Sequence, residues 1–304
     1  MSAEAQSREH GPLALVLGGG GARGIAHLGV FEVLEREGVR PDLLVGTSIG
    51  ALGAALYGLE PDAAAVAERV LGYLRSSGFA AYGKGMTGSG EPGFVGRQWL
   101  NFKRAAALGI MSFRGGLVNP RRLREAIEGV LPDRNFSDCA VPAHITAFDV
   151  LAAKVVVLGS GSLRDAVTAS CNLAGFFPPV NRDGCYFCDP SPLASVPVIP
   201  AKQAGAARVI AVDIRAEIPP ATAAAPAPTG TDVVMRLTAA ASIKAGQVDL
   251  LEADVIIKPE VGELFWSDFS ALDELVAAGR RATLEKMDEI RALVGPPAPP
   301  AEAP

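Results

Sequence analysis

The feature that most constrains this chain is a pair of glycine-rich turns within residues 13–59. The first turn reads GGGGARG at 18–24, and the second reads GTSIG at 46–50. Each turn follows a short apolar segment and precedes apolar residues at helical spacing, so each predicts a strand–turn–helix unit. Such units are typical of α/β proteins in which helices cover both faces of a parallel sheet.

The second turn matches G-x-S-x-G, the nucleophile-elbow pattern, in which a sharp strand-to-helix bend exposes one serine hydroxyl. Gly46 and Gly50 flank Ser48 because the bend leaves no room for a Cβ atom on either side, and Thr47 and Ile49 complete the elbow. The first turn supplies backbone N–H groups at a helix N-terminus, where they can hold a developing oxyanion. Together the turns predict half of an acyl-transfer site, although Ser48 would also suit a plain helix N-cap.

Composition limits the classes of function. Nearly half of the 304 residues are apolar, and the formal net charge of −5 argues against a nucleic-acid partner. The four cysteines do not make a disulfide framework, which favours a reducing, cytoplasmic setting. The polar first 11 residues lack the apolar core of a signal peptide. No run reaches the roughly 18 apolar residues of a membrane span.

The rest of the chain continues the alternation of strands and helices. We expect strands at residues 13–17, 43–45, 143–150, 154–158, 185–188, 208–214 and 255–257. Helices are expected between the first turn and Gly38, at 49–59, from Pro61 to about 74, from Pro120 to about 130, at 166–171 behind a capping box of Ser162 and Asp165, at 232–248 and at 271–294. The predicted fold class is α/β, with three α/β/α layers and a mainly parallel central sheet.

We expect one domain over residues 13–294, with a flexible tail at 1–12 and a disordered tail at 295–304. Within it, residues 76–118 mix large apolar side chains with arginine and lysine. This segment fits a lid or an interfacial patch that touches lipid, but it also fits a helix packed on the core. Residues 219–230 are of low complexity and predict a surface loop.

A dinucleotide-binding site is an alternative interpretation of the first turn. Gly19, Gly21 and Gly24 spell G-x-G-x-x-G after a strand, and Asp42 lies near the offset of a ribose-binding acid. However, Asp42 precedes the second strand, whereas that acid belongs at the strand's C-terminal end. There the chain carries the serine turn instead, which weighs against a nicotinamide or flavin enzyme.

With both turns and a third block at 162–198, the chain resembles the patatin-like phospholipase family over its motif-bearing part, residues 13–202. The resemblance implies a patatin-like fold and a Ser–Asp dyad with Ser48 as nucleophile. It also implies that the oxyanion loop contains the residues of the first turn, namely Gly19, Gly20, Gly21, Arg23 and Gly24.

The aspartate of the dyad has two candidates. Asp183 stands in a literal Asp-Gly pair, but it precedes the predicted strand at 185–188. Asp189 follows that strand with the family's spacing and is the predicted base, although Pro190 and Ser191 stand where the family has permissive glycine. None of the three histidines, His10, His27 and His144, is placed as expected for a Ser-His-Asp triad.

The resulting prediction is a serine acyl-ester hydrolase that acts on lipids, of the phospholipase A, lysophospholipase or esterase type. Its expected partner is a lipid or acyl-ester substrate, with transient contact at a membrane surface and no nucleic acid; the head group and the oligomeric state stay open. No metal or organic cofactor is implied, since the C-x-x-C of Cys185 and Cys188 lacks further ligands. The alternative function is a catalytically impaired patatin-like scaffold that binds lipid or a protein.

Overall fold

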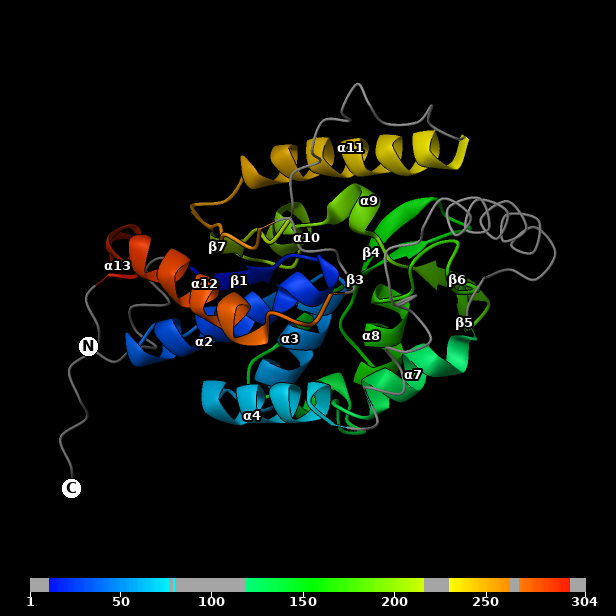
Figure 1. Cartoon of the computed structure of the whole chain (residues 1–304). Coiled ribbons are helices and arrows are strands. Elements are labelled where there is room, and N and C mark those ends of the chain that lie inside the picture. Colours follow the sequence, from blue (N-terminus) through cyan, green and yellow to red (C-terminus); the bar gives the residue numbers. More distant parts are fainter. Residues whose placement is uncertain (1–10, 77–78, 80–118, 216–229, 263–267, 296–304) are drawn as a thin grey trace, which may run out of the picture.

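The computed structural model describes residues 11–76, 79, 119–215, 230–262 and 268–295. A central sheet lies between two layers of helices, and the strands that form its middle are parallel (Figure 1). The three-layer α/β/α architecture predicted from the sequence is therefore confirmed.

The sheet has eight strands in the order β5-β6-β3-β2-β1-β7-β8, and β4 pairs with β3 beside this path. The strands are β1 (Leu13–Leu17), β2 (Leu43–Gly46), β3 (Ala143–Asp149), β4 (Lys154–Leu158), β5 (Val180–Arg182), β6 (Cys185–Cys188), β7 (Arg208–Val212) and β8 (Val255–Ile257). The pairs β1–β2, β2–β3, β1–β7 and β7–β8 are parallel. The C-terminal ends of β1 and β2, where the two glycine-rich turns begin, thus lie side by side.

Strand β1 is buried on both faces, as its uninterrupted apolar sequence predicts. Leu15 and Leu17 belong to the larger core cluster, whereas Ala14 and Val16 belong to a second cluster on the other face. The alternation follows from the period of two in a strand.

The larger cluster is covered by α2 (Ala26–Arg36), α3 (Ile49–Leu59) and α12 (Leu272–Glu285), with α4 (Ala63–Leu74) packed beside α2. Helix α2 ends before Gly38, whose φ of +71° suits glycine at this position, as predicted. Helices α2 and α12 touch through backbone: a Cβ atom on Gly29 would lie 2.0 Å from the Val276 carbonyl oxygen.

The opposite face carries α9 (Ser191–Ala194), α10 (Val198–Gln203) and the long α11 (Gly230–Leu250). Val198 and Ala201 of α10 belong to the second core cluster. Helix α11 lies along the outside of α9 (Figure 1).

Helix α7 (Pro120–Glu128), the short 3-10 helix η2 (Phe136–Asp138) and α8 (Leu163–Ser170) complete the layer beside α3. Helix α7 begins as predicted, because the Asn119 side chain accepts a hydrogen bond from the Arg121 N–H. Strands β3 and β4, both predicted from the sequence, pair as an antiparallel hairpin.

Two predicted helix boundaries are wrong. Pro61 is not the first residue of α4, since Asp62 is its N-cap and accepts a hydrogen bond from the Ala65 N–H. The helix predicted at 271–294 is two helices, because the backbone leaves helical geometry at Lys286 before α13 (Met287–Val294). The break turns Met287 and Ile290 toward the core.

Several predictions fall outside the described residues. They concern the tail residues 1–10 and 296–304, most of the 76–118 segment and the 219–229 loop. Gly11 and Pro12, the last residues of the predicted N-terminal tail, accept hydrogen bonds from residues at the start of β7. In the described part of the chain, no helix has the length and apolar character needed to cross a bilayer.

Candidate active site

Ser48 stands on a strained backbone between β2 and α3. Its φ is +55° and its ψ is −120°, a conformation that costs a residue with a side chain about 1–3 kcal/mol. A Cβ atom on Gly46 would lie 2.2 Å from the Gly50 carbonyl oxygen, and one on Gly50 would lie 2.1 Å from the Leu17 carbonyl oxygen. Only glycine fits at these two positions, so the turn has the close packing of a nucleophile elbow.

Hydrogen bonds from other segments hold this turn in place. The Ser48 N–H donates to Ser170 Oγ at 2.8 Å, and the Thr47 hydroxyl donates to the Ala194 carbonyl at 2.8 Å. Thr146 of β3 lies within 2.6 Å of the Thr47 hydroxyl. The Ser48 side chain makes no capping hydrogen bond, so the N-cap interpretation of this serine has no support. Nothing in the local sequence pointed to Ser170 or Thr146, which come from distant elements.

Asp189 follows β6 and is brought to Ser48. Its side chain is only 3% exposed, and its N–H donates to the Asn172 carbonyl at 2.8 Å. Burial raises the pKa of Asp189, and contacts with the Ser191 and Ser48 hydroxyls partly offset this effect by stabilising the ionised form. The structure therefore brings together the two residues predicted to form the dyad.

The two oxygens of this carboxylate have different surroundings. Oδ1 accepts hydrogen bonds from the Ser191 N–H at 2.8 Å and from Ser191 Oγ at 2.5 Å. Oδ2 is buried and has no hydrogen-bond partner among the described residues. The Ser48 hydroxyl is close enough to lower the pKa of Asp189, but no well-aligned hydrogen bond joins the two side chains within the described ranges.

Cys171 is a further neighbour of Ser48 that sequence reasoning missed. Its thiol interacts with the Ser48 hydroxyl, while burial and the charge of Asp189 raise its pKa well above the ordinary value. The thiol therefore stays protonated at neutral pH and is an uncharged neighbour of the serine.

The first glycine turn is fixed on both sides. The Gly18 N–H donates to the Val212 carbonyl, and the Gly19 N–H donates to the Ser195 carbonyl at 2.8 Å. Because its N–H is engaged, Gly19 offers no open donor to a substrate. Gly20 and Gly21 follow at the start of the 3-10 helix η1 (Gly21–Ile25), where the first N–H groups have no intrahelical acceptor.

Two side chains shape this turn. Arg23 Nε donates to the Gly20 carbonyl at 3.0 Å, and the buried His27 Nε2 lies 2.9 Å from the Gly18 carbonyl, to which it donates. Burial lowers the pKa of His27 to about 4, so the ring is neutral and serves the loop rather than catalysis. Burial lowers the pKa of Arg23, and the nearby charge of Asp213 offsets only part of this effect. Arg23 is therefore not a free surface residue.

Asp213 and Ile49 connect the first glycine turn to neighbouring segments. Asp213 is held by Arg215 through two hydrogen bonds of 2.7 and 2.8 Å. Gly24 packs against the elbow so closely that a Cβ atom there would lie 2.4 Å from the Ile49 side chain. The first turn and the elbow therefore form one packed unit.

The competing candidates occupy other places. Asp42 accepts a hydrogen bond from the Leu13 N–H at the N-terminal end of β1, the end opposite to the glycine turns. Asp183 has a φ of +53° in the turn between β5 and β6, and its side chain is 94% exposed.

The two cysteines of the C-x-x-C pattern lie in β6 without further metal-binding side chains among the described residues. Cys185 and Cys188 are free thiols, and across the described ranges no group of three or more His, Cys, Asp or Glu side chains could hold a metal ion.

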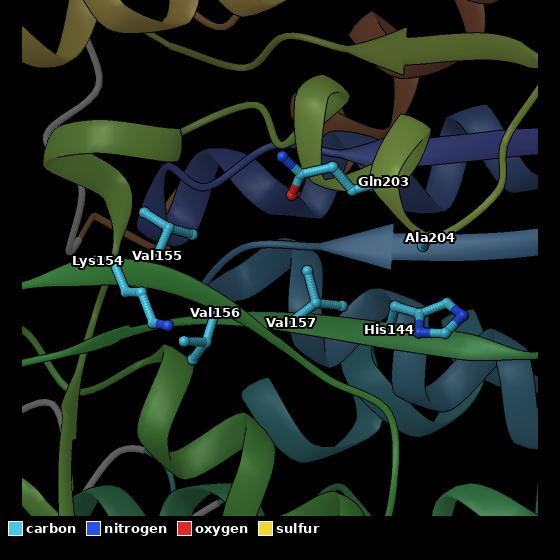
Figure 2. Close-up of a pocket in the computed structure, with 7 residues that line it drawn as sticks. All are labelled: His144, Lys154, Val155, Val156, Val157, Gln203 and Ala204. Carbon is cyan, nitrogen blue, oxygen red and sulfur yellow. The ribbon is translucent and has the colours of Figure 1, made fainter. Parts of the chain in front are cut away.

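A separate groove of about 400 Å³ runs along β4. Its lining residues are His144, Lys154, Val155, Val156, Val157, Gln203 and Ala204 (Figure 2). Figure 2 shows Lys154 and His144 at opposite ends of the groove, so their side chains do not converge on one ligand. Burial lowers the pKa of His144. None of these residues belongs to the elbow or to the glycine turn.

The fold and the site define an α/β protein with a serine on a strained strand-to-helix elbow, beside a buried aspartate and a glycine-rich turn. Residues 15–202 match the family model of the patatin-like phospholipases, and the chain belongs to this family. It is 34% identical over 204 residues to human "Patatin-like phospholipase domain-containing protein 6" and 31% identical over 202 residues to "Lysophospholipase NTE1" of Mycosarcoma maydis.

These similarities cover 66% of this chain but only 13% and 10% of those relatives. The chain thus spans a small part of the length of the curated relatives it matches. A solved structure, VipD from Legionella pneumophila, superimposes with a TM-score of 0.47 at 17% identity, over 92% of this chain and 67% of that one.

Proposed function

We propose that this protein is a serine hydrolase that cleaves acyl esters of lipids through a dyad of Ser48 and Asp189. The observation that carries the proposal is the approach of the elbow serine to a buried carboxylate whose Oδ2 lacks a partner among the described residues. A buried acceptor without a partner is costly, so a role in accepting a proton gives it a physical reason.

In the proposed first step, Asp189 accepts the hydroxyl proton of Ser48 while Ser48 Oγ attacks the carbonyl carbon of the ester. Serine is a poor nucleophile until a base takes its proton. The hydrogen bond between nucleophile and base is often long without substrate and tightens in the complex, which fits the present geometry. The proton then passes to the departing alkoxide, and the acyl group remains on Ser48.

The tetrahedral intermediate carries a negative oxygen that needs donors. We assign this role to the Gly20 and Gly21 N–H groups, because Gly19 already donates to Ser195. The hydrogen bond from Arg23 to the Gly20 carbonyl keeps this peptide in place. One such donor contributes about 3–4 kcal/mol in other acyl-transfer enzymes. Water activated by Asp189 then releases the acid and restores Ser48.

The lipid substrate is inferred from the family and from relatives named phospholipase and lysophospholipase. Contact with a lipid surface is supported by α11, where Val233, Val234 and Leu237 are 51%, 62% and 68% exposed. Exposed apolar side chains on an outer helix suit transient contact with a membrane surface. A hydrolase of lipid esters would meet its substrate at such a surface.

The test is active-site labelling with a fluorophosphonate, located by peptide mass, because the probe needs no knowledge of the substrate. We expect an adduct on Ser48 in the wild type and none there in Ser48→Ala. Asp189→Asn should lower the labelling rate at least about 100-fold, since it removes a general base. Asp183→Asn is the matched control and should label like the wild type, because Asp183 is exposed in a turn.

Labelling is repeated with detergent micelles, so that a covered site is also sampled. No adduct on folded wild-type protein under either condition would overturn the hydrolase proposal and favour the lipid-binding scaffold. An adduct on Ser191 instead of Ser48 would contradict the assignment of the nucleophile.

A further inference from the structure

Ser191 makes two hydrogen bonds to a single oxygen of Asp189. Its N–H and its hydroxyl both donate to Oδ1, at 2.8 and 2.5 Å. With Oδ1 satisfied, Oδ2 is the oxygen left for another donor. The plane of the carboxylate is thereby held in one orientation, because a partial rotation about the Cβ–Cγ bond would move Oδ1 away from both donors.

Ser191 is itself held from two sides. The Ser242 hydroxyl of α11 donates to the Ser191 carbonyl at 2.7 Å, which joins α9 to the helix that covers it (Figure 1). On the other side, Ser191 Oγ lies 2.9 Å from the position that a Cβ atom on Gly19 would take. The serine hydroxyl is therefore packed between Asp189 and the first glycine turn.

We infer that Ser191 is a positioning residue that turns Oδ2 of Asp189 toward Ser48. Its two hydrogen bonds to Oδ1 also favour the charged form of this carboxylate. The inference rests on the proposed Ser48–Asp189 dyad. It gives a physical role to the Asp-Pro-Ser sequence, which departs from the glycine-containing pattern that the resemblance led us to expect. Pro190 has no N–H to donate, and Ser191 supplies both a backbone and a side-chain donor directly after it.

Among the described residues, the titratable groups that face Asp189 are the thiols of Cys171, at the end of α8, and of Cys188 in β6. Neither brings a positive charge that would favour the ionised carboxylate. Burial and the charge of Asp189 raise the pKa of both, that of Cys188 to about 11, so both are neutral across the working pH range. Hydrogen bonds from Ser191 are thus the main interactions that oppose the effect of burial on Asp189.

The experiment measures the rate of fluorophosphonate labelling at Ser48 against pH, for the wild type and three variants. Ser191→Ala removes the hydroxyl, and we expect the acid limb of the profile to move up by about one pH unit, because a base with a higher pKa loses its charge at higher pH. Ser191→Thr keeps the hydroxyl, so its acid limb should lie at the same pH as that of the wild type. Ser242→Ala removes a hydrogen bond to the same residue but not to Asp189, and it should leave the limb in place.

The outcomes separate the inference from the proposed function. Suppose that the wild type labels at Ser48. If the acid limb of Ser191→Ala then stays at the wild-type pH, or if Ser242→Ala shifts the acid limb as much as Ser191→Ala does, the positioning role of Ser191 is wrong and the proposed hydrolase function is unaffected. If the wild type does not label at all, the proposed function fails first. Should Ser191→Ala fail to fold, as judged by thermal unfolding, Ser191→Gly replaces it, since glycine also lacks the hydroxyl.

Discussion

Ser48 shows how one residue's backbone depends on groups far away in the sequence. Its left-handed φ of +55° is held by the hydrogen bond to Ser170 and by the hydrogen bond from Thr47 to Ala194. Strain of this kind persists only where the surrounding structure fixes it, and it commonly lies at functional sites. The strained position and the buried carboxylate beside it are two independent signs of a working site.

His27 is a second residue whose environment makes a measurable prediction. Its pKa is about 4 in the folded protein and about 6.5 in the unfolded chain. The unfolded state therefore binds a proton first as pH falls, so the free energy of unfolding should drop between about pH 6.5 and pH 4. The loss attributable to His27 should be about 2 kcal/mol between pH 7 and pH 4.5.

The measurement compares urea unfolding of the wild type and His27→Gln at both pH values. Glutamine can donate to the Gly18 carbonyl but does not titrate, so the variant should lose less stability on acidification. The raised pKa of Asp189 makes the free energy of unfolding rise on acidification, and it does so in both proteins. The quantity to compare is therefore the difference in stability loss between wild type and variant. An equal loss in both would show that His27 is not buried in its neutral form.

At the scale of elements, glycines let helices α2 and α12 pack with their backbones in direct contact. A Cβ atom on Gly29 would lie 2.0 Å from the Val276 carbonyl oxygen, and one on Gly279 would lie 2.0 Å from the Ala26 carbonyl oxygen. Both obstacles are backbone, so neither can move aside as a flexible side chain would. Gly29→Ala or Gly279→Ala should lower the free energy of unfolding by about 3 kcal/mol.

Gly72 provides the matched control for these variants. It lies inside α4, and a Cβ atom added there would meet nothing within 4 Å. Gly72→Ala should raise the free energy of unfolding by about 0.5–1 kcal/mol, because alanine has the higher helix propensity. Denaturant unfolding of all three variants tests this, and equal effects at Gly29 and Gly72 would contradict close contact between α2 and α12.

At the scale of the whole molecule, the site lies where the parallel strands β1 and β2 end, and α11 spans the layer outside it (Figure 1). In open α/β sheets, ligands bind outside the carboxyl ends of the strands, which is where the two turns meet. Ser242 connects α11 to the Asp189 loop, so the helix with the exposed apolar residues is also bonded to the site.

Contact of α11 with a lipid surface can be tested by co-sedimentation with phosphatidylcholine vesicles. Leu237→Asp should weaken binding about 10-fold or more, since it removes an exposed leucine that would be buried in the interface. Thr238→Asp adds the same charge at the neighbouring exposed position and should weaken binding much less. Equal weakening by both would indicate that charge and not apolar contact governs binding, and fluorophosphonate labelling without vesicles should be unchanged in both.

Most strands and helices followed from the sequence, because a buried strand or an amphipathic helix is encoded in neighbouring residues. The short elements β5, α9 and α10 were not predicted. Strand β8 was predicted at its observed limits, and β3 and β4 were both found from their apolar runs. The break at Lys286 was missed because it depends on how Met287 and Ile290 reach the core. Such packing has no local pattern in the sequence.

By itself, the sequence determined the two glycine turns, the elbow serine and most of the order of strands and helices, because steric limits on glycine and apolar periodicity act within a few residues. Only the tertiary structure decided which side chains surround Ser48. Asp189 was expected beside Ser48 from the family resemblance, but Ser170, Cys171 and Ser191 were not, and their interactions depend on distances that the folded sheet sets. The same folding engaged the Gly19 N–H and left Oδ2 of Asp189 without a partner in the described part of the chain.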